Sequence, residues 1–220
     1  LLGTLPGRGL AGEALARYRD RIEAYMTKAA REAKRDTSWM DPHADYERAL
    51  ADFVRGALSR DGPNPFLDDI ETQAGTVAWY GALNSLAMAA IKFASPGVPD
   101  LYQGNELVDL SLVDPDNRRP VDFGARERLL AAFESGPADA AAVEALLADP
   151  CDGRAKLWVT WRLLQLRRLA PALLSQGDYR GLAIRGAAQR HGLFVHRAFG
   201  QRALALLSPP RFAGRGDAPA

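Results

Sequence analysis

The chain has 220 residues, of which 47% are hydrophobic and 25% charged, and its formal net charge is +1. This composition is typical of a soluble globular protein and excludes collagen, coiled-coil and disordered classes. The near-neutral total hides an uneven distribution, because residues 1–60 carry 11 basic and 9 acidic side chains, residues 61–150 carry 5 and 15, and residues 151–220 carry 12 and 3.

Residues 13–34 carry apolar side chains at every third or fourth position, which predicts an amphipathic helix with a basic opposite face. Asp41 and Pro42 predict the N-cap and the first residue of a second helix, whose apolar stripe continues to Leu58. Pro63 and Pro65 should end that helix. A third helix is expected over about 72–94; it is apolar nearly all round, so we expect it to be buried on most sides.

The pattern changes after Ser95. Residues 98–102 form a short β-prone run, which predicts a strand, and residues 105–122 form a polar, acidic loop of a length that is usually functional. Helices are predicted at 125–133, 138–148 and 156–169. Beyond Pro171 the period falls toward two, which predicts antiparallel strands at 179–184, 192–199 and 202–207 with a hairpin turn at 199–202.

The location of the protein is indicated by what the chain lacks. Its single cysteine, Cys151, forms no internal disulfide, and residues 1–10 do not resemble a signal peptide. The most apolar stretch, 77–94, is rich in alanine and includes Lys92, so it falls short of a membrane-spanning helix. We therefore expect a cytoplasmic protein with no membrane partner. Because the chain does not begin with Met, we also expect it to be part of a longer protein.

The acidic loop is the strongest candidate for a binding site. Carboxylates accept two hydrogen bonds and guanidinium groups offer a planar fork, so such side chains can bind sugar hydroxyls. Tyr102 and Gln103 end the predicted strand and could line the floor of the pocket. The alternative is a solvated loop whose charges pair with one another. The candidate loop residues are Asp114, Asp116, Asn117, Arg118 and Arg119.

Residues 97–106 (GVPDLYQGNE) and 111–123 (SLVDPDNRRPVDF) together resemble the last barrel strand and following loop of the maltooligosyltrehalose synthases, within the α-amylase superfamily. Residues 26–34, with Thr37-Ser38-Trp39, Tyr46-Glu47 and the helix at 74–87, resemble that family's helical insertion. The resemblance covers about 1–125, with a weaker match over 177–199.

This resemblance implies an α/β fold: the helix-rich C-terminal part of a (β/α)8 (TIM) barrel with a helical insertion, followed by the start of an antiparallel β-domain. Residues 1–94 would be the insertion, 95–171 the last strand, substrate loop and following helices, and 172–220 the β-domain. The implied activity is an intramolecular transglycosylation that converts the reducing-end α-1,4 linkage of a maltooligosaccharide to α-1,1. The family's catalytic carboxylates lie upstream, so the partner is the missing N-terminal part of the same enzyme, and this chain alone should be inactive.

Related α-glucan enzymes assign sugar contacts to the first Asp and the following Arg of a DPxxR loop. These are Asp114 and Arg118, with Asp116, Asn117 and Arg119 next in line. A catalytic pairing of Asp114 with Asp116 is not favoured, since two carboxylates of one loop usually share a solvated or Arg-paired environment.

Other features favour structural interpretations. The basic helix face of Lys28, Arg31, Lys34 and Arg35 could contact substrate, but pairs such as Lys28 with Glu32 favour an exposed helix. Trp39 could stack on a sugar or anchor a helix connection as a buried residue. We expect no metal, because the three histidines are scattered, and neither a cofactor nor a nucleic acid. Two alternative functions stay open: another glucan hydrolase or transferase of the superfamily, and a non-catalytic helical glucan-binding or interaction module.

Overall fold

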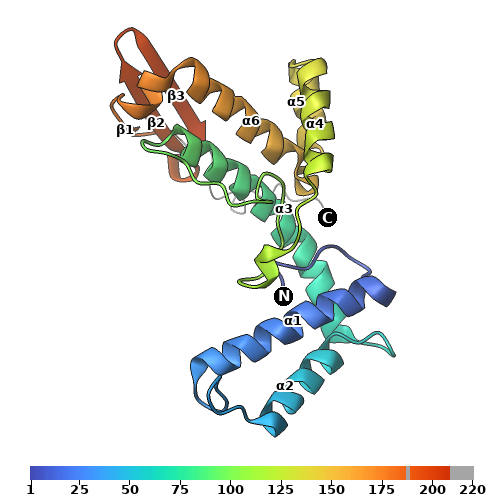
Figure 1. Cartoon of the computed structure of the whole chain (residues 1–220). Helices are drawn as coiled ribbons and strands as arrows, with labels where there is room; N and C mark the ends of the chain where they lie inside the picture. Colours follow the sequence, from blue (N-terminus) through green and yellow to red (C-terminus); the bar gives the residue numbers. More distant parts are fainter. Residues whose placement is uncertain (187–188, 209–220) are drawn as a thin grey trace. The chain divides into compact units, whose positions relative to one another are not determined.

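The computed structural model describes residues 1–186 and 189–208, which form two compact units (Figure 1). Unit 1 consists of residues 1–78 and 110–120. Unit 2 consists of residues 79–109 and the described residues from 121 onward. The long helix α3 (Pro65–Ala94) contributes residues to both units. Residues 187–188 and 209–220 of the predicted β-domain lie outside the described residues.

Unit 1 is built on a hairpin of two helices, α1 (Gly12–Ala33) and α2 (Ala44–Ala57), which pack against each other (Figure 1). The predicted first helix is confirmed. Its buried apolar stripe meets α2, the first turns of α3 and the N-terminal segment in one core of Leu5, Leu15, Tyr18, Ile22, Val54, Leu58, Leu67 and Ala74. The spacing of these residues on α1 and α2 accounts for the packing, because side chains three or four apart share one helix face.

The predicted start of α2 is wrong by two residues. His43 is the N-cap, and its Nδ1 accepts a hydrogen bond from the backbone N–H of Tyr46 at 3.0 Å. Asp41 instead belongs to a turn with Ser38, in which the backbone N–H of Asp41 donates to Ser38 Oγ at 2.9 Å and the backbone N–H of Ser38 donates to Asp41 O at 3.1 Å. The turn keeps Asp41 away from the helix end, so Asp41 cannot cap it.

Helix α3 differs from prediction in its start and in its burial. It begins at Pro65, because proline suits the first helical position and Asn64 Oδ1 accepts from the backbone N–H of Leu67 at 3.1 Å. The expectation of burial on most sides is wrong, since Val77 is 41% and Met88 70% exposed. The apolar side chains surround the whole helix, whereas the described residues cover only part of its circumference.

No strand forms at 98–102, where a strand was predicted. A strand needs a neighbouring strand to take up its backbone hydrogen bonds, and the described sheet lies elsewhere in the chain. Val98 is 97% exposed. The polar loop that follows is confirmed as irregular, apart from the short 3-10 helix η1 (Asp116–Arg118).

Unit 2 contains helices and a small sheet. The predicted helices are confirmed as α4, α5 and α6, and α4 and α5 both pack against α6; the rings of Phe133 and Trp161 lie 6.2 Å apart. A short helix follows that the sequence pattern did not predict. The elements are α4 (Phe123–Ser135), α5 (Ala140–Leu147), η2 (Pro150–Asp152), α6 (Arg154–Leu169), α7 (Pro171–Ser175), β1 (Arg180–Leu182), η3 (Gln189–His191), β2 (Leu193–Phe199) and β3 (Arg202–Ser208).

The three strands form an antiparallel sheet in the order β1-β2-β3 (Figure 1). Phe199 pairs with Arg202, so the predicted hairpin turn is confirmed, and Gly200 occupies the left-handed region at φ 59°. The helix α7 packs against β2 and β3 through buried Leu173 and Leu174. The helix-rich character and the small antiparallel sheet are therefore confirmed.

Candidate functional site

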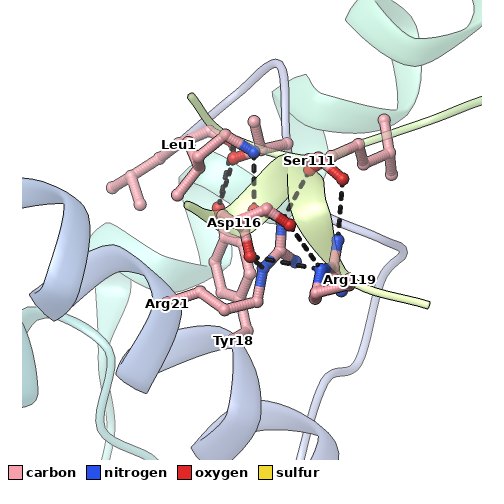
Figure 2. A network of polar contacts seen from close by, with 9 residues as sticks. Leu1, Tyr18, Arg21, Ser111, Asp116 and Arg119 are labelled. Carbon is pink, nitrogen blue, oxygen red and sulfur yellow. Dashed lines mark hydrogen bonds and ion pairs between the residues drawn. The ribbon is translucent and has the colours of Figure 1, made fainter. Parts of the chain in front are cut away.

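The candidate loop residues 114–119 lie in unit 1, and a two-point ion pair holds them to α1 (Figure 2). Arg21 Nε donates to Asp116 Oδ1 at 2.9 Å, and Arg21 Nη2 donates to Asp116 Oδ2 at 2.8 Å. The same Nη2 donates to the carbonyl of Leu110 at 2.7 Å. Because the guanidinium fork matches a carboxylate in geometry, this contact fixes the orientation of the loop on the helix.

Asp116 is the centre of this network. Its side chain is 13% exposed, and its Oδ2 also accepts from the backbone N–H of Leu112 at 2.6 Å. Burial by itself raises the pKa of Asp116, but the hydrogen bonds from Arg21 and Leu112 outweigh burial, so the pKa lies below its usual value. Both oxygens of the ionised carboxylate are therefore occupied by the protein.

Arg119 closes the loop on its other side. Its Nε donates to the carbonyl of Asp116 at 3.0 Å and lies 3.2 Å from Asp116 Oδ1, and its Nη2 donates to Ser111 Oγ at 2.9 Å (Figure 2). Half of the Arg119 side chain stays exposed. Arg119 thus stabilises the turn and still presents part of its guanidinium to solvent.

Asp114 and Arg118 form the outward part of the loop. They pair with each other, and their side chains are 46% and 71% exposed. Lys28 of α1 donates through Nζ to the backbone carbonyl of Asp114, so the backbone is held from behind while the side chain faces out. A ligand at the surface can therefore form hydrogen bonds with the exposed parts of both side chains.

Asn117 is half-buried within η1, and its Oδ1 has no hydrogen-bond partner among the described residues. A buried amide oxygen without a donor is costly, since it has lost its contact with water.

Tyr102 and Gln103 belong to unit 2 and are exposed. The residues that follow them are held by contacts within unit 2. Arg126 of α4 donates from Nη2 to the carbonyl of Gly104 at 2.8 Å and from Nε to Glu106 Oε2 at 3.0 Å. Gly104 has φ 94°, in the left-handed region that favours glycine.

A half-buried lysine supports the same segment. Lys156 Nζ donates to the carbonyl of Leu107 at 3.2 Å, and burial together with the nearby charge of Lys92 lowers the pKa of Lys156. Close by, Gly153 sits at φ 82° where α6 begins, and a Cβ there would lie 2.7 Å from the backbone nitrogen of Val108. The approach of the loop to this helix end therefore requires glycine.

Sequence reasoning missed the residues that hold these loops. Arg21 lies 95 positions from Asp116, and Arg126 and Lys156 lie 20 or more positions from their partners. Each is an isolated cation on a helix, and only the tertiary structure shows which carboxylate or carbonyl it meets. The expected contact between Lys28 and Glu32 is present at 3.8 Å, but it is secondary to the Lys28 contact with the loop.

Chemically, the loop suits binding of hydroxyl groups better than proton transfer or nucleophilic attack. The Asp116 carboxylate is paired with Arg21, and the Asp114 carboxylate is paired with Arg118. The outward donors and acceptors are flat, charged groups of both signs, which match the vicinal hydroxyls of a sugar.

Comparison with known proteins gives a consistent result. Over 188 residues the chain is 35% identical to Mycobacterium tuberculosis proteins, from strains CDC 1551 and H37Rv, whose names assign them to the maltooligosyl trehalose synthases. That match covers 86% of this chain and 22% of the relative. The solved maltooligosyltrehalose synthase from Arthrobacter ramosus matches with a TM-score of 0.75 and 35% identity, over 91% of this chain and 24% of that one.

A solved Sulfolobus tokodaii protein described as a hypothetical maltooligosyl trehalose synthase also matches, with a TM-score of 0.66, 27% identity, and coverage of 89% of this chain and 24% of that one. The chain thus spans about a fifth of the length of its curated relatives and is homologous to that part of them. No family model matches the chain. Within the described residues, no helix is both long and apolar enough to cross a bilayer.

Proposed function

We propose that this chain is the C-terminal part of a maltooligosyltrehalose synthase, an isomerase that converts the reducing-end α-1,4 linkage of a maltooligosaccharide to α-1,1. The observation that carries the proposal is the agreement of sequence and fold with such enzymes over about nine-tenths of the chain. The exposed pair of Asp114 and Arg118, on a loop held rigidly from behind, adds a surface suited to a glucan.

Within this proposal the loop residues have two roles. Asp114 and Arg118 hold sugar hydroxyls, and half-buried Asn117 lies between them in η1 as a further polar group of the site. Arg119 contributes through the exposed half of its guanidinium, and Asp116 acts mainly as an internal anchor rather than as a sugar contact. Tyr102 and Gln103, which end the predicted last barrel strand, are proposed to line the pocket floor.

The catalytic step is proposed to use carboxylates outside this chain. A retaining transglycosylation needs a carboxylate nucleophile and a carboxylic acid/base on either side of the scissile bond. Asp114 and Asp116 are both engaged with arginines, which favours a binding role for this loop. Residues 98–102 are then the last barrel strand, formed only beside the other barrel strands, and 172–220 the start of a β-domain. A cytoplasmic location is part of the same proposal.

The experiment is an assay of the full-length protein that contains this chain, with maltopentaose as substrate. We expect loss of reducing ends without release of glucose, and no reaction from the 220-residue chain alone. New reducing ends would indicate a glucan hydrolase or another transferase instead. Tight calorimetric binding of maltopentaose by the chain, without any reaction of the full-length protein, would indicate a binding module.

The role of the loop is tested by Arg118→Ala in the same assay. Removing the guanidinium leaves a hydroxyl or Asp114 unpaired, so we expect substrate binding to weaken by about 1–3 kcal/mol. Arg48→Ala is the matched control, because Arg48 is also an exposed arginine, on α2, paired with exposed Asp45. Unchanged kcat and KM for Arg118→Ala would remove this residue from the site.

A further inference from the structure

Trp39 lies in unit 1, in the connection between α1 and α2, and its side chain is exposed. The exposed fraction is 56%, so Trp39 is not a buried anchor of the helix connection. A large aromatic ring that stays exposed to water does not gain the free energy that its burial would contribute.

The backbone on both sides of Trp39 is fixed by a small polar cluster. Arg31 donates from Nε and Nη2 to the two oxygens of Glu47 at 2.7 and 2.6 Å. Buried Thr37 donates its hydroxyl to Glu47 Oε1 at 2.7 Å and accepts from the backbone N–H of His43 at 3.0 Å. The exposed ring is therefore carried by a rigid connection rather than by a loose loop.

The Trp39 ring also has a planar, positively charged neighbour, the guanidinium of Arg31. The guanidinium of Arg31 lies over the Trp39 ring, 4.8 Å from its centroid, in a cation–π contact. A flat aromatic surface beside a fixed guanidinium matches a pyranose, which presents C–H groups on its face and hydroxyls at its rim.

The Trp39 ring and the candidate loop are each contacted by a basic side chain of α1. Lys28 and Arg31 are three residues apart and so are neighbours on the helix surface. Lys28 binds the backbone carbonyl of Asp114, while Arg31 covers the Trp39 ring. At 1.5 Å per residue, Lys28 and Arg31 lie about 4.5 Å apart along the helix axis. The α1 residues that contact the candidate loop and the Trp39 ring are therefore less than one helical turn apart.

We propose that Trp39 is a distal subsite that stacks on one glucosyl unit of a maltooligosaccharide whose other end is held at the Asp114–Arg118 pair. This inference rests on the proposed function for the identity of its ligand. It makes Trp39 a determinant of chain-length preference: a short substrate does not reach the ring and a longer one does.

The first test compares maltotriose with maltoheptaose as substrates of the full-length protein. Trp39→Ala should raise KM for maltoheptaose relative to KM for maltotriose by about 5- to 20-fold, with kcat affected less than KM, and Trp39→Phe should restore part of the difference. Met40→Ala is the control, because Met40 is adjacent and 95% exposed. A Trp39→Ala variant with the same KM ratio as wild type would overturn the subsite while leaving the proposed function intact.

The second test does not depend on catalysis. The indole N–H resonance of Trp39, assigned by its loss in Trp39→Phe, is followed while maltoheptaose is added to the 220-residue chain. We expect it to shift, whereas the resonances of Trp158 and Trp161 in unit 2 should not. If the full-length protein proves inactive and the Trp39 resonance also stays fixed at the highest sugar concentration, both proposals fail. A shift of the Trp39 resonance without activity of the full-length protein would support the subsite and contradict the proposed function.

Discussion

At the scale of single residues, the basic side chains of α1 hold other segments of unit 1 in place. Arg21 holds Asp116, Lys28 holds the backbone of Asp114, and Arg31 holds Glu47. Each cation is partly buried, and Arg21 and Arg31 form bidentate ion pairs, which are stronger than exposed ones. The surface that the sequence presents as a uniformly basic helix face is thus a set of specific contacts.

Glu47 leads to a prediction about pH. The hydrogen bonds from Arg31 and Thr37 lower the pKa of Glu47 from 4.5 to about 2. A carboxyl whose pKa is lower in the folded state contributes stability that is complete above the unfolded pKa and is lost as the pH falls through the folded pKa. We therefore expect Glu47→Gln to reduce the free energy of unfolding more at pH 6 than at pH 3, measured by urea denaturation.

The control for this measurement is Asp45→Asn on the same helix. The Asp45 side chain is 85% exposed and pairs with exposed Arg48, so its substitution should have a small effect at both pH values. An equal loss of stability at pH 6 and pH 3 for Glu47→Gln would contradict the role assigned to the ionised carboxylate.

At the scale of elements, a fully buried arginine joins two helix ends to the sheet of unit 2. Arg197 on β2 is 0% exposed and donates to the carbonyls of Ala94 at the end of α3, Leu174 in α7, Gly177 and Asp178, at 2.7 to 3.1 Å. Carbonyls at the end of a helix lack partners within it and carry partial negative charge, so a buried cation is well placed among them.

We expect Arg197→Met to lower the free energy of unfolding of unit 2 by about 3–5 kcal/mol, because it leaves four carbonyls without their donor. Urea unfolding followed by the fluorescence of Trp158 and Trp161 measures this change. The control is Arg202→Met: Arg202 lies on the adjacent strand, is exposed and donates to one carbonyl, that of Leu169. Its substitution should cost less than about 1 kcal/mol, and a similar cost for both variants would refute the importance of the buried guanidinium.

At the scale of the whole molecule, the chain exposes apolar surface on a helix whose sequence predicts burial. Met88 of α3 is 70% exposed and Leu169 at the end of α6 is 75% exposed. Large exposed apolar side chains of this kind favour association with other surfaces. In the proposed enzyme, the remaining parts of the barrel would cover them.

The isolated chain should therefore self-associate as its concentration rises. Met88→Glu removes apolar surface and adds one negative charge, so we expect it to reduce the mass-averaged size measured by light scattering after size-exclusion chromatography. Gln201→Glu adds the same charge at an exposed turn without removing apolar surface. A chain that stays monomeric at every concentration, or an equal effect of the two variants, would contradict this explanation.

The sequence by itself determined the local elements and the resemblance to a known family. Periodicity located α1, α4, α5, α6 and the strands of the sheet, because amphipathic patterns are set by which residues of one element share a face. The motif at 111–123 located the candidate loop, and its resemblance agrees with the comparisons. Helix ends were less predictable: the start of α2 depends on a turn between Ser38 and Asp41, and that of α3 on Asn64.

Only the tertiary structure decided which residues support the site and how. It assigned Asp116 to Arg21, 95 residues away, and so separated the internal carboxylate of the loop from the outward one, Asp114, although the two are alike in sequence. It also showed that Trp39 is exposed and that residues 98–102 form no strand. Long-range pairing depends on which distant group a side chain meets, and strand formation depends on a neighbouring strand, neither of which local sequence patterns contain.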